Sequence, residues 1–280
     1  MKQSSGHFFK KHHVGTYVVL ILLMALTSLP MISMIGNALK ANKQVIFDRG
    51  LFPKSPTLSN FVFVFQETSF PRNLLNSLIA SVSVTIVCVW IACMAGYALS
   101  RYRGTGFTAF KSVTYMFQVV PLVLLMIPLF MIVKTIGLHN NILSIIISYA
   151  AITLPLAIWT MKGFFDTISF EIEESALIDG AGIFRSFLSI ILPISTPGIM
   201  TAAVLTFTFA WNEYMLANIF IQRTEKTTLT VALAQFAQQS IVDYGYQMAA
   251  ASIASIPAAL LLVFAQKYII QGLSAGATKG

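Results

Sequence analysis

Six long apolar stretches alternate with polar segments along this chain. Each stretch lacks Asp, Glu, Lys and Arg over at least 22 residues, and a helix needs about 20 apolar residues to cross the hydrocarbon core of a bilayer. Trimmed to helix length, the stretches predict six transmembrane helices, at 16–36, 74–98, 110–133, 142–162, 197–219 and 247–270. The pattern therefore predicts an all-α integral membrane protein.

The composition supports the same fold class. Apolar residues make up 56% of the chain and charged residues 10%, whereas soluble domains carry about 25% charged residues. The net charge of +8 does not indicate nucleic acid, because Lys and Arg set the topology of a membrane protein. With both termini in the cytosol, ten basic residues face the cytosol and eight face outside. This small excess favours cytosolic termini.

The predicted helices divide the chain into five parts. These are a cytosolic tail (1–15), a first transmembrane helix (16–36), an extracytoplasmic loop (37–73), a five-helix core (74–270) that includes the cytosolic loop 163–196, and a cytosolic C-terminal tail (271–280). An uncharged outer stretch, 227–242, is too short for a span and predicts an interfacial or re-entrant segment. Prolines inside several spans predict kinks, which suit either ordinary bundle irregularity or a gate.

The cytosolic loop carries an unusual concentration of acid. Its acidic residues are Asp166, Glu171, Glu173, Glu174 and Asp179. Ser169 can cap a helix whose first turns hold three of these acids, which suits the helix dipole. The run Gly180-Ala181-Gly182 would end that helix and leave backbone that a partner can approach. The residues alone fit either a solvated amphipathic helix or a docking helix.

The spacing of this segment, Glu-x-Ala-x3-Gly-x9-Ile-x-Leu-Pro, resembles the EAA loop of permease subunits in ATP-binding-cassette importers. Two small residues depart from the usual pattern, namely Ser175 in place of an alanine and Ser169 where a proline often stands. The resemblance implies a type I importer (MetI-like) permease fold in which 169–182 is a cytosolic coupling helix held by an ATPase subunit. The ATPase-coupling residues that it implies are Glu171, Glu174, Ser175, Ala176, Asp179, Gly180, Ile190, Leu192 and Pro193.

Other segments are similar to carbohydrate-uptake permeases of the maltose type. They are Asn76-Ser77-Leu78, the run 95–102, Trp211-Asn212-Glu213-Tyr214 and the ending 271–280. This resemblance implies an ATP-driven, binding-protein-dependent importer of sugar, in particular oligosaccharide, that works by alternating access in a bacterial cytoplasmic membrane. It implies as partners a second, different permease, two ATPase subunits and an extracytoplasmic sugar-binding protein. ATP and Mg²⁺ would lie on the ATPase subunits, and this chain would hold no cofactor and no metal.

Glu213 is the one acid inside a predicted span, and an ionisable group there is a functional hypothesis. Its neighbours Trp211, Asn212 and Tyr214 combine aromatic and polar groups that suit a sugar. Alternatively, Glu213 lies near the outer interface, solvated or paired with Arg223. We favour a structural or gating role for Glu213 over direct sugar contact. The candidate substrate-pathway residues are Asn76, Gln118, Trp211, Asn212, Glu213 and Tyr214.

The side-chain inventory argues against an enzyme. All four histidines lie outside the predicted spans, and the chain contains neither an HExxH helix nor a GxxxxGK[ST] phosphate loop. Cys88 and Cys93 lie on different faces of one span, so they predict packing and neither a disulfide nor a metal site. The remaining alternatives are an importer for amino acids, polyamines or phosphate, and, less favoured, a channel, which does not need the acidic loop.

Overall fold

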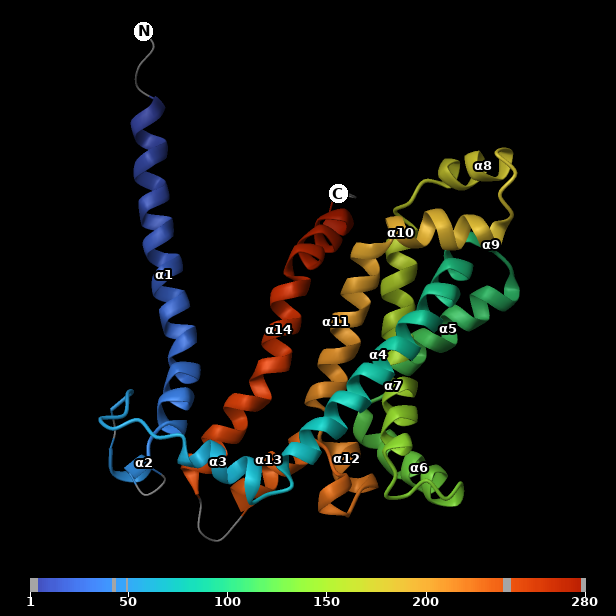
Figure 1. Ribbon diagram of the computed structural model, residues 1–280. Helices are drawn as coiled ribbons and strands as arrows, with labels where there is room; N and C mark the ends of the chain where they lie inside the picture. The colour runs from blue at the N-terminus through green and yellow to red at the C-terminus, as the bar shows by residue number, and fades with distance from the viewer. Residues whose placement is uncertain (1–4, 42–43, 49, 239–242, 278–280) are drawn as a thin grey trace. The chain divides into compact units, whose positions relative to one another are not determined.

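The computed structural model describes residues 5–41, 44–48, 50–238 and 243–277, and every regular element in these ranges is helical. The elements are α1 (Ser5–Ala38), α2 (Gln44–Phe47), α3 (Ser59–Gln66), α4 (Phe70–Arg101), α5 (Thr105–Val119), α6 (Leu122–Thr135), α7 (Ile142–Phe165), α8 (Phe170–Ile178), α9 (Ile183–Ser186), the π-helical turn η1 (Phe187–Ile191), α10 (Leu192–Ile194), α11 (Thr196–Asn212), α12 (Met215–Phe220), the 3₁₀ turn η2 (Thr224–Lys226), α13 (Leu229–Gln238) and α14 (Tyr244–Ala277) (Figure 1). The predicted all-α class is confirmed.

The described helices account for the predicted spans in two ways. Four segments are long and apolar enough to cross a membrane alone, and they are Gly15–Ala38 within α1, α4, α7 and Tyr244–Tyr268 within α14. Two further spans are sharply bent pairs, α5 with α6 at 105° and Ile183–Ile194 with α11 at 74°. With each bent pair counted as one span, the described chain has up to six, as predicted.

Two spans predicted as single helices are broken in the structure. The prediction 110–133 is wrong as one helix, because α5 ends before Val120 and Pro121, which are both extended. The residue before a proline is disfavoured in helical conformation. The prediction 197–219 is also wrong as one helix, because α11 ends at Asn212 and the extended Glu213 precedes the short α12. Hydropathy alone does not detect either break.

The chain divides into two compact units, 1–68 with 235–253 and 69–234 with 254–280. In the described part of the first unit, the predicted outer loop is folded around the buried Lys40. Its ammonium donates to the carbonyl oxygens of Asp48 (2.7 Å) and Gly50 (2.5 Å). The Asn60 amide donates to the carbonyls of Ala38 and Lys40. These bonds give the segment after α1 a defined structure, which includes α2 and α3.

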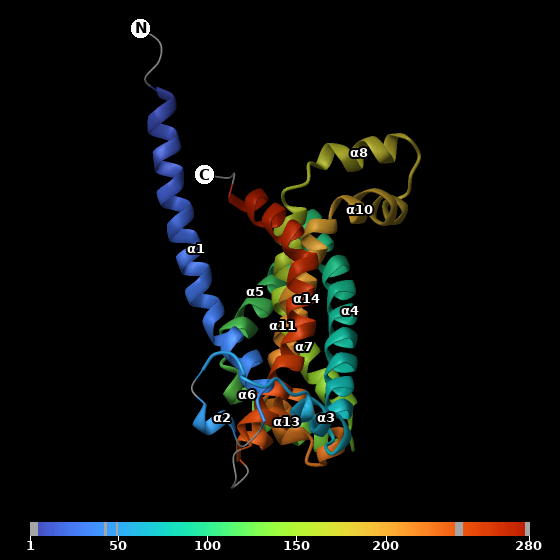
Figure 2. The same ribbon diagram turned by 60° about the vertical axis from the view of Figure 1, so that its left-hand side comes forward.

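In the second unit α4, α7 and α11 pack against one another and form the core. Figures 1 and 2 show α8, α9 and α10 together at one end of these three helices, and α6 and α12 at the other. Cys88 and Cys93 are buried and unbridged within this core, as predicted for packing residues. The second unit therefore has a centre of three packed helices with a separate group of elements at each end.

Gly96 allows α4 and α7 to approach closely. A Cβ atom on Gly96 would lie 2.9 Å from both the Lys162 backbone nitrogen and the Met161 Cβ. We expect Gly96→Val to destabilise the protein by about 1–3 kcal/mol, the usual cost of overpacking, measured by thermal unfolding in detergent. The matched control is Gly163→Val in α7, where a Cβ would meet nothing within 4 Å. Equal losses in both variants would show that the cost comes from helix propensity rather than from this contact.

Candidate functional site

Helix α8 begins and ends as the sequence predicts. The Ser169 hydroxyl accepts a hydrogen bond from the Glu171 backbone N–H at 3.3 Å, which caps the helix. At the other end Gly180 has a φ of 83°, a left-handed conformation that favours glycine. The Gly180 and Ala181 N–H groups bond back to the carbonyls of Leu177 and Ala176. The predicted segment 169–182 is thus a capped helix of nine residues followed by a glycine stop.

One face of α8 is exposed, and we call it the α8 surface. It comprises Glu171, Glu174, Ser175, Ile178 and Asp179, which all fall on the same side at helical spacing. Ile178 is 85% exposed, and the nearby Phe184 on α9 is 70% exposed. Acidic groups beside exposed apolar side chains indicate a surface that a partner covers. This geometry favours a docking helix over a merely solvated one.

The structure does not bring all the predicted coupling residues to the α8 surface. Glu171, Glu174, Ser175 and Asp179 belong to it, and Gly180 lies exposed directly after it. Ala176 is buried on the opposite side of α8. The last three predicted residues follow α9, on η1 and α10. Ile190 and Leu192 are half-buried, and Pro193 is exposed.

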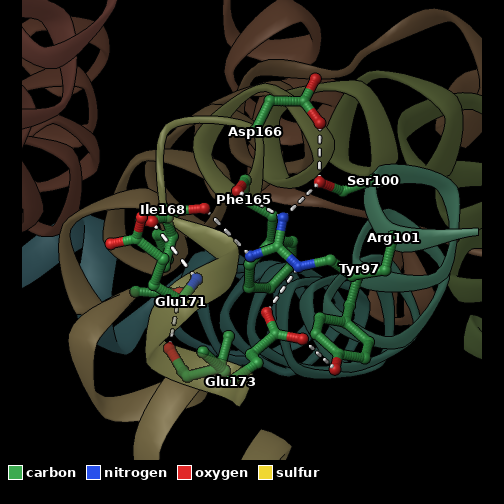
Figure 3. A network of polar contacts seen from close by, with 11 residues as sticks. Tyr97, Ser100, Arg101, Phe165, Asp166, Ile168, Glu171 and Glu173 are labelled. Atoms are coloured by element: carbon green, nitrogen blue, oxygen red, sulfur yellow. Dashed lines mark hydrogen bonds and ion pairs between the residues drawn. The ribbon is translucent and has the colours of Figure 1, made fainter. Parts of the chain in front are cut away.

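The buried face of α8 is fastened to the end of α4 by three side chains, which we call the inner anchor (Figure 3). The Glu173 carboxylate accepts a hydrogen bond from Arg101 Nε at 2.5 Å and another from the Tyr97 hydroxyl at 2.8 Å. The Arg101 and Glu173 side chains are only 6% and 9% exposed. The guanidinium also donates to the carbonyls of Phe165 (3.1 Å) and Ile168 (3.2 Å). One arginine therefore joins α4, the end of α7 and α8.

A second polar cluster joins the same ends of α4 and α7. The Asp166 carboxylate accepts from the Ser100 hydroxyl at 2.6 Å and from the Lys162 ammonium at 2.5 Å, and Arg101 donates to that same hydroxyl (Figure 3). Partial burial by itself raises the pKa of Asp166, but the hydrogen bonds and the positive charge of Lys162 outweigh it and lower the pKa below its usual value. Asp166 is therefore ionised at neutral pH, and it supports the inner anchor from the α7 side.

Sequence reasoning did not select Arg101 or Glu173 as site residues. Glu173 and Ala176, three residues apart on one side of α8, are both buried. The sequence contains two signals for Arg101 and Glu173. Glu173 shares a helix face with Ala176, and Arg101 ends a charge-free run.

Glu213 lies at the break between α11 and α12, where its carboxylate takes the place of missing backbone partners. One oxygen accepts from the Leu216 N–H at 2.9 Å, and the other accepts from the Ala217 N–H at 3.3 Å and from the Tyr149 hydroxyl at 2.6 Å. Glu213 is buried, and the ion pairs among the described residues do not include it. The interpretation that it is solvated or paired with Arg223 is therefore wrong. The geometry supports a structural role.

The other candidate pathway residues do not converge on one cavity. Asn76 and Trp211 are buried, and both donate to backbone carbonyls, Asn76 to those of Glu225 and Thr227 and Trp211 to that of Ala254. Asn212 is exposed and bonds within its own helix, while Tyr214 is half-buried.

Gln118 lines a cavity of about 430 Å³ between α5, α6, α7 and α11, whose walls are mainly apolar. The other five candidates do not line it. A role of the six residues in sugar passage stays a prediction.

Residues 88–275 match the family model described as the binding-protein-dependent transport system inner membrane component. The inner membrane ABC transporter permease protein YcjP of Escherichia coli is 32% identical over 270 residues, which cover 95% of this chain and 96% of the relative. The maltodextrin transport system permease protein MdxG of Bacillus subtilis is 31% identical over 284 residues and the full length of both chains. The trehalose transport system permease protein SugB of Mycobacterium tuberculosis is 32% identical over 92% of this chain and 95% of the relative.

The fold is also similar to that of a chain in the crystal structure of a bacterial ABC transporter involved in the import of the acidic polysaccharide alginate. The TM-score is 0.79 at 22% identity, and the match covers 96% of this chain and 99% of that one. A second structure of a bacterial alginate ABC transporter, in complex with a periplasmic protein that holds an alginate pentasaccharide, matches with a TM-score of 0.67 at 16% identity. The match covers 94% of this chain and 96% of that one.

Proposed function

Because the chain belongs to the family of binding-protein-dependent transport system inner membrane components, we propose that it is the permease subunit of an ATP-driven sugar importer. The observation that carries the substrate class is the full-length match to a maltodextrin permease. Permeases named for trehalose and for diacetylchitobiose match over at least 90% of this chain. Oligosaccharides are therefore the substrates to test first.

The α8 surface is the proposed contact with an ATPase subunit in the cytosol. It is acidic and partly apolar, and the inner anchor holds the opposite face of the same helix to α4 and α7. A force applied to α8 therefore acts on the spans rather than on a loose loop. The C-terminal end of α14 lies at the same end of the second unit (Figures 1 and 2). In this proposal that end, and with it the C-terminus, faces the cytosol.

The proposed assembly contains this chain, a second permease, two ATPase subunits and an extracytoplasmic sugar-binding protein. ATP and Mg²⁺ bind to the ATPase subunits, and closure of those subunits moves α8. The inner anchor passes the movement to α4 and α7, and the spans alternate between inward-open and outward-open states. The sequence resemblance and the anchored, exposed α8 support this assembly.

The test of this function is uptake in the native host with and without this chain. We expect loss of ATP-dependent uptake of maltodextrins, trehalose or diacetylchitobiose in the deletion strain, and its return on complementation. ATPase subunits and a binding protein are expected to purify with the tagged chain. Unchanged uptake of all three sugars, with loss of amino acid, polyamine or phosphate uptake, would replace the sugar proposal. Uptake that persists without ATP would instead indicate a channel.

Reversal of one charge on the α8 surface tests the contact with the ATPase. Glu174 is exposed, and Glu174→Lys leaves the buried face of α8 intact. In this proposal the ATPase surface opposite the acidic α8 surface is positively charged, and like-charge contacts across an interface cost several kcal/mol. We therefore expect ATPase subunits to bind at least about tenfold more weakly, equivalent to about 1.4 kcal/mol, as measured by co-purification and ATPase rate. Glu67→Lys, an exposed acid on the predicted extracytoplasmic loop, is the control. Equal co-purification in both variants would contradict docking at Glu174.

A further inference from the structure

The N-terminal end of α4 holds the segment between α12 and α13. Asn73, Asn76 and Ser77 share one face of the helix, since they are three and four residues apart, and all three are buried. Asn73 Nδ2 donates to the carbonyls of Thr224 (2.7 Å) and Thr227 (3.1 Å). Asn76 Nδ2 donates to the carbonyls of Glu225 (3.0 Å) and Thr227 (3.0 Å). Ser77 Oγ accepts from the Leu229 N–H (2.8 Å). We call these three side chains, with the backbone of 224–229, the outer clamp.

The outer clamp acts on the backbone, and the side chains of the first part of the segment, 222–226, stay exposed. Gln222, Arg223, Thr224, Glu225 and Lys226 are all exposed. Just before the clamp, the Asn140 side chain accepts from the Gln222 and Arg223 N–H groups at 2.7 and 3.3 Å. Asn140 lies in the turn that precedes α7, so the segment 222–229 is attached to both α4 and α7. A segment held in this way moves with those two helices.

Helix α4 contains no proline between the outer clamp and the inner anchor. Among the four described helices that could each cross the membrane alone, α4 is the one without a proline beyond its first turn. The others contain Pro30, Pro155 and Pro257. Sharp bends in helices arise mainly at proline. At 1.5 Å per residue, the 28 steps from Asn73 to Arg101 span about 42 Å, and the close approach at Gly96 holds α4 against α7 near its inner end.

We propose that α4, with α7 packed against it, carries the movement of α8 to the outer segment 222–229, and that Asn73, Asn76 and Ser77 are the positioning residues at its outer end. This inference rests on the proposed function, because it takes ATP-driven movement of α8 as its source. In this inference Asn76 positions the outer segment and does not bind sugar. The physical basis is one helix without an internal proline that has buried, specific hydrogen bonds at both ends, so a displacement of one end is passed to the other.

The test follows both ends of α4 in the complex purified from the native host through a tag on this chain. An environment-sensitive fluorophore is placed on a cysteine introduced at the exposed Lys226 or at the exposed Thr167, since Cys88 and Cys93 are buried. The probe added is ATP with Mg²⁺ and orthovanadate. We expect a fluorescence change at both positions in the parent protein. In Asn73→Ala/Asn76→Ala, which removes four of the five clamp hydrogen bonds, the change at Lys226 is reduced and the change at Thr167 is kept.

Asn218→Ala is the matched control, because Asn218 is exposed on α12 and lies outside the outer clamp, and it is expected to keep both changes. A full response at Lys226 in the assembled clamp variant would overturn the inference, and so would a parent protein that responds at Thr167 alone. A parent protein that responds at neither position would instead overturn the ATP-driven function.

If the double variant does not assemble, Asn73→Ala and Asn76→Ala are measured singly. Each removes two hydrogen bonds, and each is expected to reduce the response at Lys226 alone, so an undiminished response in both would overturn the inference.

Discussion

Arg101→Ala is expected to uncouple ATP hydrolysis from transport and to destabilise the protein by about 3–5 kcal/mol, the usual cost of removing one partner from a buried ion pair. Glu173 would be left buried with only the Tyr97 hydroxyl as donor, and the carbonyls of Phe165 and Ile168 would lose their contact with α4. The measurements are thermal unfolding in detergent, ATPase rate and sugar uptake. Uptake should fall further than ATPase activity, because α8 keeps its docking surface but not its attachment.

Two comparisons separate the inner anchor from a general effect of charge removal. Lys162→Gln breaks the more exposed pair with Asp166 four residues along α7, and such pairs are worth about 0.3–0.5 kcal/mol. Arg101→Met with Glu173→Met leaves no charge buried alone, so we expect it to recover much of the stability lost in either single variant. A single variant at Arg101 that costs no more than Lys162→Gln would contradict the assigned role of the inner anchor.

The spans were predictable because bilayer thickness fixes the length of charge-free sequence that a helix needs. The charge-free run before Arg101 ends where α4 ends, and the run before Glu213 ends where α11 ends. The prediction that the fifth span continues as one helix to residue 219 failed. Glu213 does not continue α11, because its backbone is extended and its side chain binds the backbone of α12. The prediction of the third span as one helix failed at Pro121. A hydropathy pattern indicates which segments can lie in lipid, and it carries no information on the direction of the backbone.

The candidate site shows the same division between local and distant information. The cap at Ser169 and the stop at Gly180 depend on neighbouring residues only, so the sequence was sufficient to predict α8. The inner anchor joins Arg101 to Glu173, which are 72 residues apart, and neither residue has a local signal that selects the other. The same holds for Asn76, whose backbone partners lie about 150 residues along the chain. A single polar residue in a span therefore fits both a substrate contact and a structural bond.

Glu213→Ala is expected to have the second largest effect, because it removes the carboxylate that accepts from three buried donors. These are the Leu216 and Ala217 N–H groups and the Tyr149 hydroxyl. An unsatisfied buried donor costs about 1–3 kcal/mol, and the interior of a membrane supplies little water to replace the lost acceptor. We expect reduced thermal stability of the purified complex and reduced uptake. The neighbouring Asn212→Ala, at an exposed position, should stay within about 0.5 kcal/mol of the parent protein.

Graded variants at this site separate helix capping from sugar contact. Tyr149→Phe removes one donor and keeps the carboxylate on Leu216 and Ala217, so its loss of stability should be smaller than that of Glu213→Ala. Glu213→Gln keeps one acceptor oxygen and should fall between the two. In all three variants the order of preference among maltodextrins, trehalose and diacetylchitobiose should be unchanged, because the carboxylate faces the protein backbone. A Glu213→Gln variant of normal stability with an altered sugar preference would show that the carboxylate binds substrate, since a cap controls the stability of α12 and has no means of distinguishing one sugar from another.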